Sequence, residues 1–166
     1  MVVLVTGSSG QLGQSLQFIA PNYPQINFVF CDSKTLDITN LENCRAVFQK
    51  HQPNFCINTA AYTAVDKAEN EVEKAKAINV VGAQNLAEVS KENNTILLHI
   101  STDFVFDGSK NTPYTEQDLP NPTGVYGQTK LEGEKAIAAI FDKYFIIRTS
   151  WVYSQFGNNF MKTMLR

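Results

Sequence analysis

The apolar run Val2–Thr6 leads directly into a turn with three glycines, and this junction constrains the fold more than any other feature. The run is apolar up to its last residue, which is typical of a strand covered on both faces of a sheet. The turn reads Gly7-Ser8-Ser9-Gly10-Gln11-Leu12-Gly13. In a strand–turn–helix unit that binds a dinucleotide, the first glycine permits the tight turn. The second lets a pyrophosphate approach the backbone, and the third lets the helix pack close to the sheet.

The helix expected after this turn adds phosphate ligands of its own. The first backbone amides of a helix have no partner inside it and carry the positive end of the helix dipole. We therefore expect the amides of Gln11, Leu12 and Gly13 to face the phosphates of a dinucleotide. The competing interpretation is an ordinary glycine-rich turn with no ligand.

Strand-like apolar runs alternate with helix-like segments along the rest of the chain. This order predicts a single α/β domain over residues 1–166, a doubly wound, Rossmann-like parallel sheet with strand order 3-2-1-4-5. Ligands of such sheets bind beyond the carboxyl ends of the strands, here near the switch between the first and fourth strands. The expected strands are residues 2–6, 26–31, 55–58, 95–101 and 144–149, and the expected helices are residues 10–20, 41–51, 71–92, 125–141 and 159–166.

The composition narrows the classes of function. The chain is 43% hydrophobic and 18% charged, which suits a folded domain. Its formal net charge of −2, without a basic run, argues against nucleic acid or an anionic membrane as the partner. The start has no signal-peptide pattern, and the scattered thiols of Cys31, Cys44 and Cys56 predict reduced cysteines. A cytoplasmic protein is therefore expected.

Acidic residues after the second expected strand are candidates for the adenosine end of a dinucleotide. Asp32 stands where a carboxylate can accept a hydrogen bond from the ribose 2′-hydroxyl, which favours NAD. Lys34 lies close by and suits a 2′-phosphate instead, so the choice between NADH and NADPH stays open. Asp37 and Ile38 follow after a short turn and are expected beside the adenine. The alternative is that these are surface-turn residues, with Asp37 placed ahead of a helix by its dipole.

Tyr126 and Lys130 have the spacing i, i+4, which places both side chains on one helix face. Carbonyl reduction needs a proton donor, and a phenol with a pKa of about 10 donates poorly unless a neighbouring ammonium lowers that pKa. Thr102 follows the fourth expected strand, where its hydroxyl could hold the same carbonyl oxygen. We expect these three residues to be catalytic. The alternative is an exposed tyrosine and lysine on an amphipathic helix.

Several segments, taken in order, resemble the dTDP-4-dehydrorhamnose reductases of the extended short-chain dehydrogenase type. They read TGSSGQLG, LDIT, NTAAYTAVDKAE, STDFVFDG, YGQTK with LEGEKA, and RTSWVY with FGNNFMKTMLR. The resemblance covers essentially the whole chain. It implies NADPH- or NADH-dependent reduction of the 4-keto group of a dTDP-4-dehydro-6-deoxysugar, with a nucleotide sugar and further copies of the same chain as partners.

The same resemblance assigns roles to individual residues. It implies catalytic roles for Thr102, Tyr126 and Lys130, and substrate contacts for Thr102, Asp103 and Trp151. It implies cofactor contacts for Gln11, Leu12, Gly13, Asp37, Ile38, Ala61, Tyr62 and Thr63. Members of the family are nearly twice as long, so the resemblance implies that this chain lacks a C-terminal part that supplies much of the sugar pocket.

Two positions depart from the family. Phe104 stands where a tyrosine is usual, which removes a hydroxyl near the substrate. Some members hold an interface Mg²⁺ through a glutamate in the first helix, but this chain reads Gly13-Gln14-Ser15, so no metal is expected. His99 lies in an apolar strand and is expected to be buried and hydrogen-bonded, and neither it nor His51 has ligands at metal spacing.

Two other classes of function remain open. The first is a non-catalytic nucleotide-binding subunit, a role that the regulatory subunit of methionine adenosyltransferase shows to be possible for this family. Intact Thr102, Tyr126 and Lys130 argue against it. The second is a sugar-nucleotide epimerase or dehydratase. Asp103 fits the acidic residue that dehydratases carry after the threonine, but Phe104 supplies no carboxylate.

Overall fold

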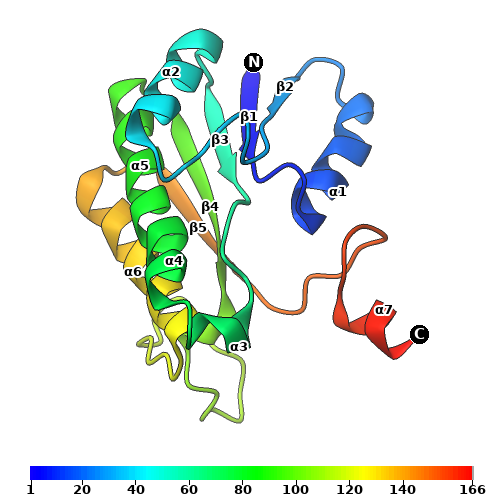
Figure 1. Ribbon diagram of the computed structural model, residues 1–166, viewed down its shortest axis with the longest axis vertical. Coiled ribbons are helices and arrows are strands. Elements are labelled where there is room, and N and C mark those ends of the chain that lie inside the picture. The colour runs from blue at the N-terminus through cyan, green and yellow to red at the C-terminus, as the bar shows by residue number, and fades with distance from the viewer. Residues whose placement is uncertain (166) are drawn as a thin grey trace.

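A five-stranded parallel sheet with helices on both faces makes up the computed structural model, which describes residues 1–165 (Figure 1). The strands are β1 (Val2–Thr6), β2 (Asn27–Phe30), β3 (Phe55–Asn58), β4 (Ile96–Thr102) and β5 (Tyr144–Thr149). The helices are α1 (Gln11–Ile19), α2 (Leu41–His51), α3 (Val65–Ala68), α4 (Val72–Lys76), α5 (Gly82–Glu92), α6 (Val125–Ile140) and α7 (Phe160–Met164), with short turns η1 (Ala20–Asn22), η2 (Ala77–Val81) and η3 (Asp103–Val105). The last residue of the expected helix 159–166 lies outside the described residues.

The doubly wound class is confirmed, but the predicted strand order 3-2-1-4-5 is wrong. The sheet runs β2-β1-β3-β4-β5, and β1 pairs with β2 on one side and β3 on the other. The reason lies in how the strands pack. β3 buries Cys56 and Asn58 almost completely, as a central strand does, whereas the four-residue β2 begins at the exposed Asn27 and suits a sheet edge. The switch point therefore lies between β1 and β3.

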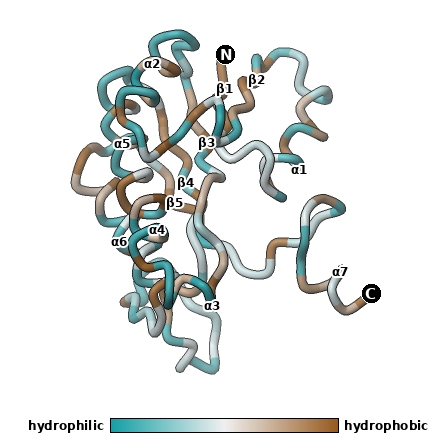
Figure 2. The backbone as a smooth tube through the Cα atoms, in the orientation of Figure 1, coloured by the Kyte–Doolittle hydropathy of each residue, from teal (hydrophilic) through white to brown (hydrophobic). Residues whose placement is uncertain are grey.

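Helices cover the two faces of the sheet unequally. Figure 1 shows α1 on one side of the sheet and α2, α5 and α6 on the other. The main hydrophobic core lies under these three helices, where Leu4, Phe48, Leu86 and Ile137 are fully buried. Burying one such side chain contributes about 1.5–3 kcal/mol. In Figure 2 the hydrophobic residues concentrate in the strands and on the inner sides of the helices.

The expected helix 71–92 is present but contains a π-helical turn, η2, between α4 and α5. This turn carries Asn79, which is 2% exposed. The Asn79 amide accepts from the backbone N–H of Tyr62 at 2.9 Å and donates to its carbonyl oxygen at 3.2 Å. The wider turn thus holds the loop after β3 in place, and π-helical turns are frequent at functional sites for such reasons.

The face of the sheet that α1 covers stays open over β3, β4 and β5. Side chains alternate along β5, and those on the open side are exposed, with Phe145 at 61% and Ile147 at 40%. Leu98 of β4, which pairs with Phe145, lies on the same face of the sheet and is half-buried. β5 is also the edge of the sheet. An apolar strip therefore faces solvent on this side of the chain.

Two findings bear on the expectations drawn from composition. Cys31, Cys44 and Cys56 are buried and form no disulfide. Among residues 1–165, none of the helices combines the length and the hydrophobicity that crossing a membrane requires.

Candidate active site

Two cavities lie at the carboxyl ends of the strands and share Gly10, Thr59 and Ala61. The first has a volume of about 390 Å³, and the second about 280 Å³. The first contains ten of the residues that the sequence predicts for the site: Gly10, Gln11, Leu12, Ala61, Thr63, Thr102, Asp103, Tyr126, Lys130 and Trp151. The second contains Gly7, Gly10, Asp37, Ile38 and Ala61. Together they form a trough across the switch between β1 and β3, where a dinucleotide binds in sheets of this kind.

The glycine turn forms the middle of this trough. Gly7 has a φ of +62°, and a Cβ on it would lie 2.6 Å from the backbone nitrogen of Ala60. A Cβ on Gly13 would lie 2.5 Å from the carbonyl oxygen of Gly7. Neither position accepts a side chain without displacing backbone. The turn therefore brings the start of α1 against the end of β1, as the sequence predicts.

The N-terminus of α1 is suited to an anion. Gly10 occupies the N-cap position, no side chain caps the helix, and its first turn holds no acidic residue. The amides at the start of a helix lack partners within it. Because Gln11 and Leu12 line the first cavity, the positive end of the helix dipole opens onto the trough. A pyrophosphate there would satisfy these amides.

Of the two acidic residues predicted for the adenosine end, Asp37 lines the second cavity and Asp32 does not. The Asp32 carboxylate accepts from the backbone N–H groups of Lys34 at 3.1 Å and Thr35 at 2.9 Å, and from the Thr35 hydroxyl at 2.9 Å. These bonds, led by that from the hydroxyl, lower the pKa of Asp32. Asp32 thus forms the surface turn that the alternative interpretation describes, and its contact with a ribose stays a prediction.

The loop after β3 presents its residues in alternation. Ala61 and Thr63 line the first cavity, whereas Tyr62 is 7% exposed and packs against Ala68 and Ala75 in a small core of its own. The Tyr62 hydroxyl donates to a carboxylate oxygen of Glu71 at 3.2 Å. Its phenol therefore faces away from the trough, and a contact between Tyr62 and the cofactor stays a prediction.

Thr102 and Tyr126 come together from different elements at the first cavity. Thr102 ends β4, and Tyr126 lies in the first turn of α6. The Thr102 hydroxyl accepts from the Phe104 backbone N–H and donates to Asp103 Oδ1, both at 3.2 Å. The ring of Phe104 meets the Tyr126 ring edge-on, with centroids 5.6 Å apart. The phenol is thus walled by Phe104 on one side and open to the cavity on another.

The expectation that Lys130 lowers the pKa of the Tyr126 phenol is wrong. Burial raises that pKa, the hydrogen bond with Thr102 works against the rise, and the charge of Asp103 adds to it. Lys130 is 1% exposed, and its Nζ donates to the carbonyl oxygen of Ile100 at 2.7 Å. Burial lowers the pKa of Lys130 to about 8. The lysine is therefore held against β4 and exerts no resolved effect on the phenol.

The segment after β5 closes one side of the first cavity and depends on Gln11. Gln11 Nε2 donates to the carbonyl oxygen of Val152 at 2.7 Å, and Asn159 Nδ2 donates to Gln11 Oε1 at 3.1 Å. Trp151 lines the cavity yet is 64% exposed. Sequence reasoning missed this clamp, because nothing in the spacing of Gln11 and Val152 indicates that they meet.

Thr59 and Thr149 are further cavity residues that the sequence analysis missed. Both stand at the carboxyl end of a strand, Thr59 just after β3 and Thr149 at the end of β5. The rule that ligands meet the carboxyl ends of parallel strands could have identified them.

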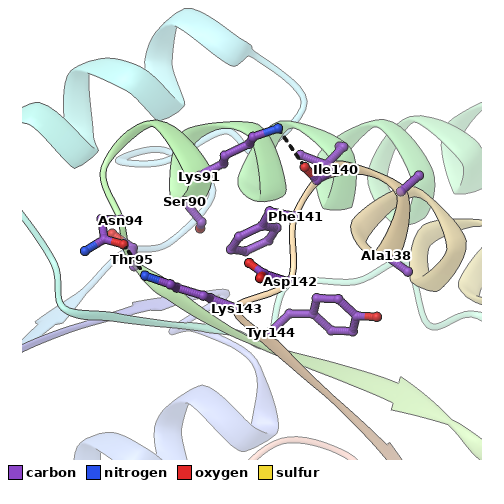
Figure 3. Close-up of a pocket in the computed structure, with 11 residues that line it drawn as sticks. Ser90, Lys91, Asn94, Thr95, Ala138, Ile140, Phe141, Asp142, Lys143 and Tyr144 are labelled. Carbon is purple, nitrogen blue, oxygen red and sulfur yellow. Dashed lines mark hydrogen bonds between the residues drawn. The ribbon is translucent and has the colours of Figure 1, made fainter.

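A larger cavity, of about 770 Å³, lies elsewhere (Figure 3). It is lined by Thr95, Lys143 and Tyr144, at the amino ends of β4 and β5, opposite the trough. Its two ammonium groups are engaged. Lys91 Nζ donates to the Ile140 carbonyl oxygen at 2.9 Å, and Lys143 Nζ donates to Asn94 Oδ1 at 2.6 Å. Size alone does not make this cavity a candidate site.

Within residues 1–165, no three histidine, cysteine or acidic side chains gather as metal ligands would.

Comparisons with known proteins agree with this geometry. A family model described as RmlD substrate binding domain matches residues 1–166. A dTDP-4-dehydrorhamnose reductase of Aggregatibacter actinomycetemcomitans is 45% identical over 99% of this chain and 56% of its own length. The Escherichia coli protein of the same name is 43% identical over 100% of this chain and 56% of its own. The chain thus spans about half the length of the curated relatives it matches.

Solved structures give the same result. A dTDP-4-dehydrorhamnose reductase of Clostridium acetobutylicum superposes with a TM-score of 0.95 at 44% identity, over 99% of this chain and 58% of that one. One from Bacillus anthracis, solved in complex with NADP, gives a TM-score of 0.93 at 44% identity, with the same coverage. The glycine turn, the trough and these matches over the whole chain together show that the chain belongs to the RmlD substrate binding domain family.

Proposed function

We propose that this chain carries the dinucleotide-binding half of a reductase that uses NADPH or NADH to reduce the 4-keto group of a dTDP-4-dehydro-6-deoxysugar, in the synthesis of dTDP-L-rhamnose. The observation that carries the proposal is the first cavity. It brings Thr102, Tyr126 and Lys130 to the same trough as the glycine turn, although Thr102 follows the end of that turn by 89 positions in the sequence. Relatives named for this reaction match the whole chain at 40–45% identity.

The residues present fit a dinucleotide. A side chain at Gly7 would meet the backbone after β3, one at Gly13 would meet the turn itself, and no side chain caps the helix that starts there. The pyrophosphate would lie at Gly10, one of the three residues that the two cavities share. The adenosine would then extend toward Asp37 and Ile38, and the nicotinamide toward Tyr126 and Lys130. When bound, the reduced nicotinamide supplies a hydride.

The chain's own groups would handle the proton and the orientation of the keto sugar. Tyr126, whose phenol carries its proton at neutral pH, would donate that proton to the keto oxygen. The Thr102 hydroxyl, at the end of β4, would hold the same oxygen. Lys130 would bind the nicotinamide ribose. Asp103 and Trp151, which also line the first cavity, would contact the sugar nucleotide.

Preference between the cofactors would depend on the turn after β2. The Asp32 carboxylate is engaged by Thr35 and by the amide of Lys34, which leaves the exposed Lys34 side chain as the group suited to a 2′-phosphate. The relative from Bacillus anthracis that was solved with NADP agrees with use of NADPH. We further propose that the complete protein works as a homo-oligomer in the cytoplasm, where its three buried thiols stay reduced.

An oxidation assay tests the proposal. Protein extended to the full length of its relatives is mixed with NADPH and the dTDP-4-keto sugar, and absorbance of the nicotinamide is followed. Oxidation that requires the sugar supports the proposed reaction. Binding of NADPH without oxidation would replace it with a non-catalytic binding subunit, and sugar conversion without net NADPH oxidation would indicate an epimerase or dehydratase.

A further inference from the structure

Behind the trough, a chain of buried polar groups runs from the backbone of Ala60 to Lys130. Asn58, which is 1% exposed, accepts through Oδ1 from the Ala60 backbone N–H at 3.1 Å and from the Thr6 hydroxyl at 2.6 Å. Asn58 Nδ2 lies 2.9 Å from Nδ1 of His99, and His99 Nε2 lies 3.3 Å from Nζ of Lys130. His99 is 1% exposed. The expectation of a buried, hydrogen-bonded histidine is therefore confirmed.

The backbone of Ala60 determines where the proton of His99 resides. A backbone N–H can only donate, so the atom of the Asn58 amide that faces Ala60 must be the oxygen. The other end of that amide is then an NH₂ group, which can only donate, and it faces His99 Nδ1. Nδ1 must accept. The neutral ring consequently carries its hydrogen on Nε2.

Nε2–H of His99 points at Lys130. An ammonium has three donors and no acceptor. A protonated Lys130 would therefore place its own donor against the Nε2–H donor of His99, and no hydrogen bond could form between them. A neutral amine has a lone pair that can accept from Nε2–H while one of its own hydrogens stays on the Ile100 carbonyl oxygen at 2.7 Å. This arrangement favours the neutral amine. Burial also keeps His99 itself neutral, because it lowers the pKa of the ring well below its ordinary value.

The other titratable and charged groups near Lys130 lie on α6, on β5 and just after β4. Glu134, one turn further along α6, raises the pKa of Lys130. However, its carboxylate is bound by Arg148 of β5, with Nη2 and Oε2 2.6 Å apart, and by the Ser101 hydroxyl. Tyr126, one turn earlier on α6, carries no charge at neutral pH, and burial raises its pKa further. Asp103, just beyond the end of β4, lines the same cavity as Lys130, and its carboxylate accepts from the Thr102 hydroxyl at 3.2 Å.

We propose that His99, held in one tautomer by Asn58, is a positioning residue that keeps Lys130 ready to release its proton near neutral pH. The part of this proposal that concerns catalysis rests on the proposed function, in which Lys130 stands beside the proton donor Tyr126. Lys130 then exchanges protons at the site instead of acting only as a fixed cation. The Ala60 amide, in the loop that lines the trough, fixes the direction of each hydrogen bond between Asn58, His99 and Lys130.

Titration of Lys130 by NMR tests the proposal on the 166-residue chain, without cofactor or substrate. The ¹³Cε shift of Lys130 is followed with pH in the wild type, in His99→Gln and in the control His51→Gln. Lys130 is expected to titrate near pH 8 in the wild type and in the control. His99→Gln is expected to raise the midpoint by about one pH unit or more, because the amide oxygen can accept from the ammonium. A wild-type midpoint above pH 10, or an unchanged midpoint in His99→Gln, would overturn the proposal.

A second measurement needs no variant and so does not depend on His99→Gln folding. The ¹⁵N shifts of the His99 ring distinguish the two tautomers in the wild type. A proton on Nε2 supports the proposal, and a proton on Nδ1 contradicts it. If these results hold but the extended protein fails to oxidise NADPH, only the proposed function is rejected.

Discussion

The side-chain amide of Gln11, the first residue of α1, donates to the backbone carbonyl of Val152 across 2.7 Å, and so ties the start of the first helix to the segment after the last strand. This hydrogen bond joins two residues that are 141 positions apart in the sequence, and it lies beside the glycine turn. The same side chain accepts from Asn159, which caps α7. Gln11 therefore holds residues 151–159 as a wall of the first cavity.

Loss of this clamp should be visible through Trp151, the chain's single tryptophan. Gln11→Ala removes both hydrogen bonds, and we expect Trp151 fluorescence anisotropy to fall and proteolysis within residues 152–158 to become faster. Gln14→Ala is the matched control, since the Gln14 side chain donates to the nearby carbonyl of Ser9. Equal anisotropy in both variants would show that the segment is held by other contacts.

Tyr126 should be needed for turnover and not for cofactor binding. In protein of full length, Tyr126→Phe should reduce kcat by about 10²-fold or more, the range for loss of a general acid. Affinity for NADPH should change less than about threefold, since Phe keeps the ring that packs on Phe104. Steady-state kinetics and calorimetry measure the two effects. Full turnover by Tyr126→Phe would remove the phenol from the mechanism.

The burial of Lys130 should lower the free energy of unfolding at neutral pH. The pKa of Lys130 falls from 10.5 to about 8 on folding, so the unfolded chain binds more protons between these two values. The contribution of Lys130 to the free energy of unfolding therefore rises with pH across that window and is least favourable below pH 8. At 1.36 kcal/mol per pH unit, the difference is on the order of 3 kcal/mol.

Lys130→Met should remove this cost. We expect the variant to be more stable than the wild type at pH 7, with the gain shrinking as pH rises from 8 toward 10.5. Urea denaturation of both proteins measures it, and taking the difference cancels the contributions of the buried thiols. The exposed Lys135→Met is the control. A gain that stays constant with pH would mean that Lys130 is not destabilised as an ammonium.

The apolar strip on β5 should make the 166-residue chain self-associate. Phe145 and Ile147 are exposed on an edge strand, which offers unpaired backbone groups as well as hydrophobic surface. Phe145→Lys should shift the chain toward monomer in light scattering over a concentration series. Tyr23→Lys, at another exposed aromatic side chain outside the strip, is the control. A wild type that stays monomeric at high concentration would contradict the prediction.

Local patterns in the sequence predict most of this fold. The apolar run Val2–Thr6 and the glycines after it identify β1 and the start of α1, and the positions of the five strands agree within one or two residues. The order of the strands in the sheet could not be predicted in this way, because an alternation of strands and helices is compatible with more than one strand order. The burial of Cys56 and Asn58 is what makes β3 central, and that depends on packing across distant segments.

Some features of the candidate site could likewise be predicted from the sequence, and others could not. Thr102, Tyr126 and Lys130 are recognisable from strand ends and helical spacing, and the structure brings all three to one cavity. The clamp made by Gln11 and the tautomer of His99 are not recognisable, since each depends on one contact between residues far apart. The sign of the Tyr126 pKa shift also depends on burial, which spacing does not reveal.

Titration of the 166-residue chain with NADPH tests the central claim most directly, because the trough lies entirely within it. The wild type should bind, and Gly10→Val should lose most of its affinity. A Cβ at Gly10 would already lie 3.2 Å from the Gly7 carbonyl oxygen, and the larger side chain would occupy the approach of the pyrophosphate. The exposed Ala139→Val on α6, at the cavity opposite the trough, is the comparison. Saturable calorimetric heats for the wild type and for Ala139→Val, with none for Gly10→Val, are the predicted result, and equal affinity in Gly10→Val would contradict the account.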